Sequence, residues 1–378
     1  MQKFSLDSHG KLTKRVKLNG AALLTTSYAR DVLGRIVSVV DPKLNVWSYT
    51  YDGLGRRVAV NDPDLGAWAY TYDAASRLIY QVDAKAQATA LTYDELGRVT
   101  GKYVYGKDSA GATVQETKVN SYDEARSGYF NRGKLTSTYR YVPQQTITGG
   151  TSLPYVYVPR LFDYDLAGRM AQETHQAVAG QNRLLGFDYW LDGSVKRKLL
   201  ADGTWTGEYR YDYAGRLATI DNAAVSSASE PDLFIAATQY NARGQTTSIT
   251  YGNGVTSTYS YSAARGFLTR VMSTNGAVTL IDQTYNRNAK GLITSIASPD
   301  VGRSWIYGYD GLDRLISADN QNGTVDDASY AYDDADNMVW NSKLCAGGPN
   351  LVYPAAGAAH PHAPSTICGS AVAYDAGL

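Results

Sequence analysis

Apolar and polar residues alternate along short stretches of this 378-residue chain, and each stretch ends in a turn signal. In residues 46–51, Val-Trp-Ser-Tyr-Thr-Tyr, aromatic side chains alternate with small ones, which is the period-2 pattern of a β-strand. The residues that follow, Asp52-Gly-Leu-Gly55, favour a type I turn closed by a residue in the left-handed conformation. Val58 and Val60 then fall on one face of a returning strand. The pattern therefore predicts a β-hairpin.

This hairpin recurs at a fixed spacing. Asp31, Asp52, Asp73 and Asp94 stand 21 residues apart, and each is followed by Gly or Ser and then by Arg. A second turn signal, such as Asp41-Pro, lies about ten residues after each of the first three, so turns recur at the spacing typical of short antiparallel strands. A fixed period is the signature of a repeat architecture, in which stacking on neighbouring units supplies the buried face that one hairpin lacks.

The turn residues themselves are interpreted as structural rather than as a binding site, because they recur at every turn regardless of position in the chain. We expect the Asp to accept backbone hydrogen bonds, the Tyr before it to pack on the Tyr of the next repeat, and the Arg to pair with neighbouring turn carboxylates. The residues assigned to this role are Asp31, Gly34, Arg35, Tyr51, Asp52, Gly55, Arg56, Tyr72, Asp73, Arg77, Tyr93, Asp94, Gly97, Arg98, Tyr164, Asp165, Gly168, Arg169, Tyr211, Asp212, Gly215, Arg216, Tyr309, Asp310 and Arg314.

The composition supports an all-β chain. Tyr occurs 31 times and Gly 36 times, and these residues favour strands and turns respectively. Basic and acidic residues balance at 36 each, which gives no sign of a nucleic-acid surface. The N-terminus has no apolar stretch of the signal-peptide type, and no run of about 18 apolar residues indicates a membrane span.

The motif Tyr-Asp-x-x-Gly-Arg-Leu at a period near 21 resembles the YD repeat of the RHS family, and its copies extend from residue 7 to residue 378. That family includes bacterial polymorphic toxins, the B and C components of insecticidal toxin complexes, and animal teneurins. The resemblance implies an all-β fold, a spiral of repeated antiparallel β-hairpins that closes around a hollow interior. In the family's toxins this interior holds an effector polypeptide. The resemblance also implies export or surface association.

The family's toxins end in a core segment with an Asp-Pro-x-Gly type motif, which does not appear here, and the last copy begins at Tyr374 and stops at Leu378. We therefore expect a partial, open-ended shell: a fragment, a truncated gene product or an expressed portion of one. An open end exposes a sheet edge that invites pairing with another chain.

Three segments that lack the repeat pattern divide the chain. Residues 141–160 and 222–232 are rich in Pro, Gly or small polar residues and predict loops. Residues 345–370 are predicted to be a Cys/His/Pro-rich loop insertion. It separates a repeat array over 1–344 from the start of a further repeat over 371–378.

The insertion holds Cys345, His360, His362 and Cys368, which are the residue types that bind zinc. Their spacing is not that of a standard zinc site, so three states remain open: a metal site, a Cys345–Cys368 disulfide, and two unpaired cysteines. No cofactor is expected.

Two functions follow from these observations. The first is a non-enzymatic scaffold, a segment of an RHS-type β-shell that encloses or presents a polymorphic-toxin effector. Its partners would be that effector or missing shell segments of the same system. The alternative is an adhesion module whose Tyr and Trp side chains bind carbohydrate or a cell surface. An enzyme is not expected, because the chain has no Gly-x-Ser-x-Gly, His-Glu-x-x-His, P-loop or dinucleotide motif.

Overall fold

The computed structural model of the chain describes residues 2–19, 21–107, 113–142, 156–176, 182–200, 203–221, 232–345, 347, 350–355 and 357–374. In this part of the chain the fold is all-β, as predicted, with one short 3-10 turn at Val301–Arg303 and no α-helix. The chain forms two compact units. Unit 1 contains Met1–Gln115 and Trp305–Leu378, and unit 2 contains Glu116–Ser304.

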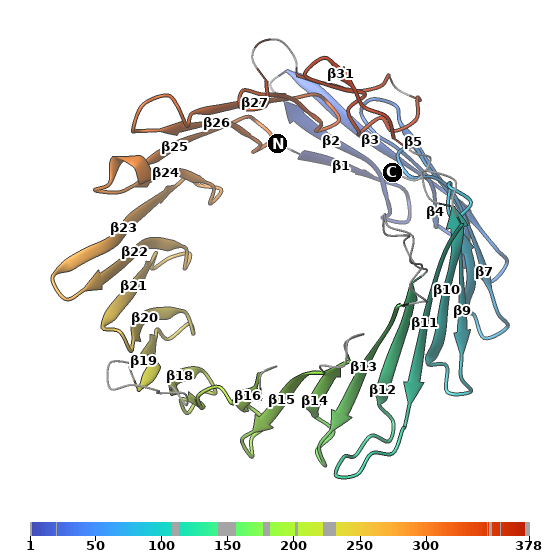
Figure 1. The fold of residues 1–378 in the computed structure, drawn as a ribbon. Helices are drawn as coiled ribbons and strands as arrows, with labels where there is room; N and C mark the ends of the chain where they lie inside the picture. Colours follow the sequence, from blue (N-terminus) through green and yellow to red (C-terminus); the bar gives the residue numbers. More distant parts are fainter. Residues whose placement is uncertain are drawn as a thin grey trace, which may run out of the picture. The chain divides into compact units, whose positions relative to one another are not determined.

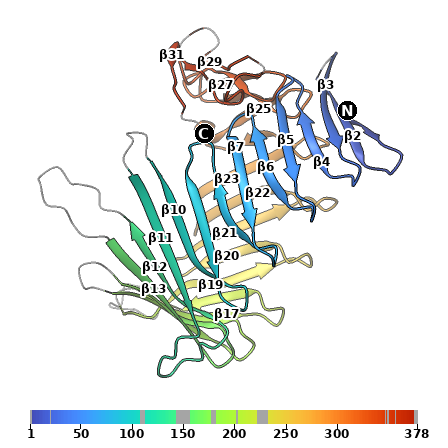
Figure 2. The same ribbon diagram turned by 90° about the vertical axis from the view of Figure 1, so that its right-hand side faces the viewer.

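The N-terminal part of unit 1 is one antiparallel sheet whose strands follow one another in sequence order. Figure 2 shows β2, β4, β5, β6 and β7 side by side in this order. The first strand pairs only with β2, so in the described part of the chain its outer edge is open. The strands are β1 (Gln2–Leu6), β2 (Leu12–Asn19), β3 (Ala22–Arg30), β4 (Ile36–Val40), β5 (Val46–Tyr51), β6 (Arg57–Asp62), β7 (Gly66–Tyr72), β8 (Leu78–Val82), β9 (Ala88–Tyr93) and β10 (Val99–Lys107).

The C-terminal part of unit 1 lies beside its first strands, the red and blue segments of Figure 1. It begins with four antiparallel strands in sequence order and ends in a small three-stranded sheet. The four are β25 (Trp305–Tyr309), β26 (Leu315–Asn320), β27 (Ala328–Tyr332) and β28 (Met338–Asn341), and the small sheet holds β29 (Leu351–Val352), β30 (Thr366–Ile367) and β31 (Ser370–Ala371).

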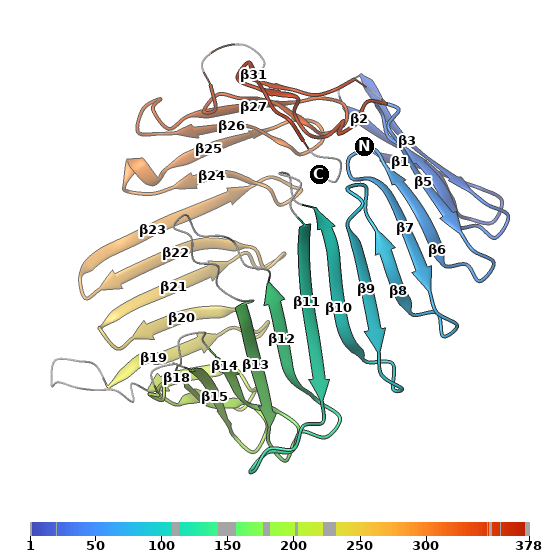
Figure 3. The ribbon, with the colours of Figure 1, turned by 45° about the vertical axis from the view of Figure 1, so that its right-hand side comes forward.

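Unit 2 repeats the same plan, and Figure 3 shows its strands β19 to β23 one after another. It contains most of β11 (Thr113–Tyr122), followed by β12 (Leu135–Val142), β13 (Val156–Tyr164), β14 (Met170–His175), β15 (Arg183–Tyr189), β16 (Val195–Leu199), β17 (Tyr209–Tyr211), β18 (Leu217–Asp221), β19 (Leu233–Tyr240), β20 (Thr246–Tyr251), β21 (Val255–Tyr261), β22 (Leu268–Asn275), β23 (Val278–Arg287) and β24 (Ile293–Ala297).

The repeat turn sets the register of each hairpin. At the first complete turn, the Gly55 N–H donates to Asp52 O over 3.0 Å and the Asp52 N–H donates to Arg56 O over 2.9 Å. Gly55 has a φ of 82°, and the strand register shifts between Thr50 and Tyr51. The left-handed residue thus absorbs the extra length of the loop as a bulge. Where this position is not glycine the backbone keeps the same conformation, at Ser76, Asp313 and Asp336.

Little apolar surface is deeply buried. In the described part of the chain, the buried apolar side chains are Leu24, Ala88, Phe162, Ala318, Ala328 and the prolines Pro159 and Pro361, and most strand residues are half-buried. Polar side chains such as those of Thr136 and Ser137 are buried as deeply. Stability therefore depends heavily on hydrogen bonds and contacts between neighbouring hairpins.

Two predicted loops fall partly or largely outside the described residues. Residues 143–155 and 222–231 are not described, but 156–160 begin strand β13, so the loop predicted over 141–160 was too long. The alternation Val-Tyr-Val at 156–158 is itself a strand signal. The predicted insertion over 345–370 contains β29 and β30. Its boundaries, and the further repeat over 371–378, stay predictions.

Replacing Gly55 by Ala is expected to destabilise the protein by about 1–2 kcal/mol, because an L-residue bears that cost in the left-handed conformation. Gly53, in the same turn, is the matched control: its φ is not positive, and a Cβ there would meet nothing within 4 Å. Urea unfolding followed by tryptophan fluorescence compares the two variants. Equal loss of stability in both would contradict the role assigned to Gly55.

Candidate functional site

Each repeat turn is closed by its own aspartate. One Asp52 carboxylate oxygen accepts the backbone N–H groups of Leu54 and Arg56 at 3.0 and 2.9 Å. The other accepts the Arg56 Nε–H at 2.7 Å. The same arrangement holds the turns at Asp31 and Asp310. The arginine therefore pairs with the carboxylate of its own turn, and the expected pair with a neighbouring turn is formed in addition at Arg314, whose Nη1 lies 2.8 Å from Asp336 Oδ1.

The arginine also reaches the next repeat. Arg56 Nη1 donates to Asp73 O over 3.0 Å, and its guanidinium lies 4.9 Å from the centre of the Tyr72 ring. Arg35 makes both contacts to the repeat at Asp52. The structure thus places an arginine over the tyrosine ring, where we expected the tyrosine of the next repeat. The same cation–π pairing occurs at Arg77–Tyr93, Arg169–Tyr189, Arg216–Tyr240 and Arg314–Tyr332.

The tyrosine completes the link in the opposite direction. Tyr51 Oη donates to Ile36 O over 2.8 Å, and Tyr72 Oη donates to Arg57 O over 2.8 Å. Each hydroxyl therefore bonds the hairpin before its own. We call the Tyr, Asp and Arg of the repeat turns the turn ladder. It joins each hairpin to both neighbours, which explains why the same three residue types recur from turn to turn.

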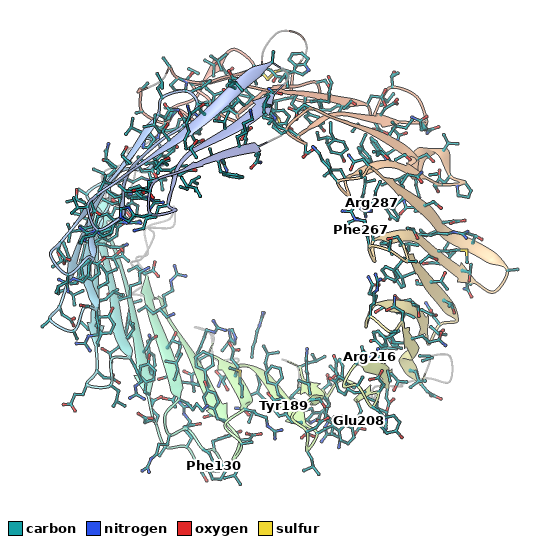
Figure 4. All side chains as sticks on the ribbon, turned by 180° about the vertical axis from the view of Figure 1, so that it is seen from behind. Phe130, Tyr189, Glu208, Arg216, Phe267 and Arg287 are labelled. Carbon is teal, nitrogen blue, oxygen red and sulfur yellow. A yellow bond between two sulfur atoms is a disulfide. The ribbon has the colours of Figure 1, made fainter. Side chains whose placement is uncertain are left out.

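The turn ladder tolerates changes of residue type. Asn241 replaces the aspartate in one turn and still accepts the N–H groups of Arg243 and Gln245. In another irregular turn the ring of Phe267 lies under the guanidinium of Arg265 and also contacts Arg287. Figure 4 shows Phe267 and Arg287 close together.

Electrostatics follow from this geometry. Burial tends to raise the pKa of Asp52, but the N–H and guanidinium groups of Arg56 outweigh it and hold that pKa below its ordinary value. The backbone N–H of Arg77 is the main cause of the lowered pKa of Asp73. The ladder carboxylates are therefore tied up as ionised acceptors, which suits a structural role better than acid–base chemistry.

A second cluster joins the two parts of unit 1. We call residues 357–365 the docking segment. His362 N donates to Asp64 Oδ1 over 2.9 Å, its Nδ1 lies 2.7 Å from Asp64 Oδ2, and its Nε2 lies 3.2 Å from Asp41 Oδ2. A ring protonated on both nitrogens can donate to both carboxylates at once. The neighbouring His360 contacts Pro63 O and Asp64 O.

Packing and charge support the same contact. The rings of Trp47 and His362 stack with centroids 5.5 Å apart, and the carbonyl of buried Pro361 accepts from Asn337. Two further ion pairs, Lys17–Asp336 and Lys43–Asp333, connect the first strands to the turn between β27 and β28. The docking segment is thus fixed to Trp47 of β5, to Asp41 in the turn before β5, and to Asp64 in the turn between β6 and β7.

The four metal-type residues of the insertion are placed separately. Cys345 and Cys368 are joined in a disulfide, and His360 and His362 face the residues around Asp64. Over the described ranges no group of three or more His, Cys, Asp or Glu residues is arranged to hold a metal ion. Nothing in the sequence pattern indicated that Asp64 and Asp41 would meet His362, which lies 298 and 321 positions away, because no spacing links them.

Hairpin repeat and turn ladder together define a YD-repeat β-sheet protein. The family model described as Teneurin YD-shell matches residues 1–145, and the one described as RHS Repeat matches residues 240–278 and 287–325. The chain therefore belongs to the RHS/YD-repeat family, and the predicted resemblance is confirmed. No curated protein sequence matches it. In the described part of the chain, no helix is long and apolar enough to cross a membrane.

Solved structures share the fold. The TcdB2-TccC3 crystal structure matches with a TM-score of 0.73 at 16% identity, over 89% of this chain and 19% of that one. A Photorhabdus luminescens Tc holotoxin pore matches with a TM-score of 0.70 at 17% identity, over 89% of this chain and 18% of that one. TcdB2-TccC3 without its hypervariable C-terminal region matches with a TM-score of 0.59 at 15% identity, over 89% of this chain and 18% of that one. The chain thus spans less than a fifth of these structures' chains.

Replacing Asp52 by Asn is expected to lower the melting temperature by a few degrees at pH 7, because Asn keeps the backbone bonds but loses the ion pair with Arg56. A carboxyl whose pKa falls on folding stabilises the protein above its unfolded value, about 3.9, and loses this effect as the pH drops through the folded pKa. The difference from wild type should therefore shrink below about pH 4.

Calorimetry from pH 7 to pH 3 measures this difference. The control is Glu95→Gln, which removes one exposed carboxylate from the repeat turn at Asp94. A constant difference at all pH values for Asp52→Asn, or an equal effect of Glu95→Gln, would contradict the ion-pair account.

Proposed function

We propose that this protein is a non-catalytic scaffold, a segment of an RHS-type β-shell that encloses or presents an effector polypeptide. The observation that supports this proposal is the turn ladder. Its carboxylates, guanidinium groups and phenolic hydroxyls are used to join hairpins, as in the contacts of Asp52, Arg56 and Tyr72. A device that repeats from hairpin to hairpin builds extended sheet, which is what a wall requires.

The solved structures support this role. The chain shares its fold with TcdB2-TccC3, and one structure of TcdB2-TccC3 was determined without its hypervariable C-terminal region. A variable region attached to a constant fold suits a wall with interchangeable contents. Because this chain spans about 19% of the TcdB2-TccC3 chain, we propose that further shell components assemble with it.

The carbohydrate-binding alternative has less support. A sugar-stacking platform needs an open aromatic face, yet the ring of Tyr72 lies under Arg56 and its hydroxyl is bonded to the preceding hairpin. The same holds for Tyr51 and Tyr93. These tyrosine side chains therefore hold neighbouring hairpins together.

Enclosure is tested by protection from a protease. The chain is expressed in its native host with an affinity tag, and the purified assembly is treated with trypsin under native conditions and in urea that unfolds the sheet. We expect a co-purified polypeptide that survives at least tenfold longer under native conditions and is cut at once in urea.

The variant Glu95→Gln is the control, and it should protect the co-purified polypeptide from trypsin as well as the wild-type chain does. A chain that purifies without a second polypeptide, or one whose co-purified polypeptide is cut equally fast in both conditions, would overturn enclosure.

A further inference from the structure

The ring of His362 lies between two carboxylates. Its Nδ1 is 2.7 Å from Asp64 Oδ2, and its Nε2 is 3.2 Å from Asp41 Oδ2. A neutral imidazole carries one N–H and one bare nitrogen, so it can donate to only one of these oxygens and turns a lone pair toward the other. The imidazolium cation donates to both. The observed geometry therefore fits a ring that carries two protons.

Both carboxylates already accept other N–H donors. Asp41 Oδ1 accepts the backbone N–H groups of Lys43 and Asn45 at 2.9 and 2.7 Å, and Asp41 Oδ2 accepts the Asn45 side-chain amide at 2.8 Å. Asp64 Oδ1 accepts the backbone N–H of His362 at 2.9 Å. Since both groups act as acceptors, the additional proton of this cluster belongs on the ring between them.

The neighbouring His360 makes no such demand. Its Nδ1 lies 2.6 Å from Asp64 O, and in the described part of the chain this carbonyl is the one hydrogen-bond acceptor that its ring meets. A neutral ring with its proton on Nδ1 satisfies that contact. Its ring otherwise packs on Tyr374, with the two centroids 5.6 Å apart. Docking is therefore linked to a proton at His362 rather than at His360.

The other charged groups around the His362 ring are balanced. On one side the Trp47 ring stacks on it and donates through Nε1 to Asp62. On the other side lies a cavity of about 380 Å³, where Lys17 pairs with Asp336. The remaining ionisable groups that line this cavity are Arg15, Tyr28, Tyr49 and Asp334. Asp41 and Asp64 are thus the groups that act on the ring at hydrogen-bond distance.

The docking segment is tied at its base. Cys345 and Cys368, on either side of it, are joined in a disulfide, and Leu351 of β29 stands opposite Ile367 of β30. The segment can therefore leave the turns at Asp41 and Asp64 while its own ends stay together. Because 25% of the His362 side chain is exposed, protons can reach the ring from solvent while the segment is docked.

We propose that the docking segment is an acid-tightened latch within unit 1. A proton on His362 fastens the segment to the turn before β5 and to the turn between β6 and β7. Loss of that proton above neutral pH weakens both contacts and releases the segment. Free histidine titrates near pH 6.5, so the latch works close to neutral pH. The latch goes beyond the proposed function and does not rest on it.

Amide hydrogen exchange of the full chain, with its disulfide intact, measures docking. The N–H groups of His360 and His362 donate to Pro63 O and Asp64 Oδ1 across the contact. After correction for intrinsic exchange, we expect protection over residues 357–365 to fall at least fivefold from about pH 5.5 to about pH 8. Uptake of one proton can change such an equilibrium by up to about tenfold per pH unit. Strands β20 to β22 of unit 2 are the internal reference and should keep their protection.

Two variants separate proton linkage from simple loss of packing. His362→Gln removes the titrating ring, so protection of the segment should be low at both pH values. In Asp64→Asn the amide oxygen can still accept the His362 N–H, while the amide N–H can donate to an unprotonated Nδ1. This variant satisfies a neutral ring and should keep the segment protected at pH 8, with no gain on acidification. The control His9→Gln removes an exposed histidine and should behave as wild type.

Three results would overturn the latch: equal protection of the wild-type segment at both pH values, a pH dependence that persists in His362→Gln, or a wild-type pH dependence in Asp64→Asn. Unchanged exchange in the reference strands shows that each variant is folded. None of these measurements involves a co-purified polypeptide, so the latch is tested independently of enclosure.

Discussion

The rest of this structure depends on a link between successive repeat turns, and each turn contributes one arginine to it. Arg56 neutralises Asp52 in its own turn, caps the Asp73 carbonyl of the next, and covers the ring of Tyr72. The tyrosine in turn bonds the hairpin behind it. A single hairpin is marginal in water. With few apolar side chains deeply buried, stability has to come from contacts between hairpins, and the turn ladder supplies such contacts once per repeat.

The same links account for the charged residues that recur in the motif. Each ladder carboxylate accepts hydrogen bonds that stabilise its ionised form. Its arginine partner contacts both its own turn and the next one.

Much of the fold could be predicted from the sequence, because the hairpin is encoded locally. Alternation fixes the strands, and the Asp-x-x-Gly spacing fixes turn and bulge even where Asp313 takes the glycine position. The partners of Arg56 and Tyr72 were predicted less well, since a repeated motif says which residues recur but not which neighbour each one touches. The contacts of His362 with Asp41 and Asp64 could not be predicted at all, because they join positions about 300 residues apart without any periodic relation.

If arginine couples neighbouring repeats, a double-mutant cycle will measure the coupling between Arg56 and Tyr72. Unfolding free energies are measured for wild type, Arg56→Gln, Tyr72→Leu and the double variant. We expect a coupling energy of about 0.5–1 kcal/mol between Arg56 and Tyr72, the size of an exposed cation–π contact. A pair of non-neighbouring repeats, Arg56 with Tyr93, should show none. Additive effects of Arg56→Gln and Tyr72→Leu would contradict the account.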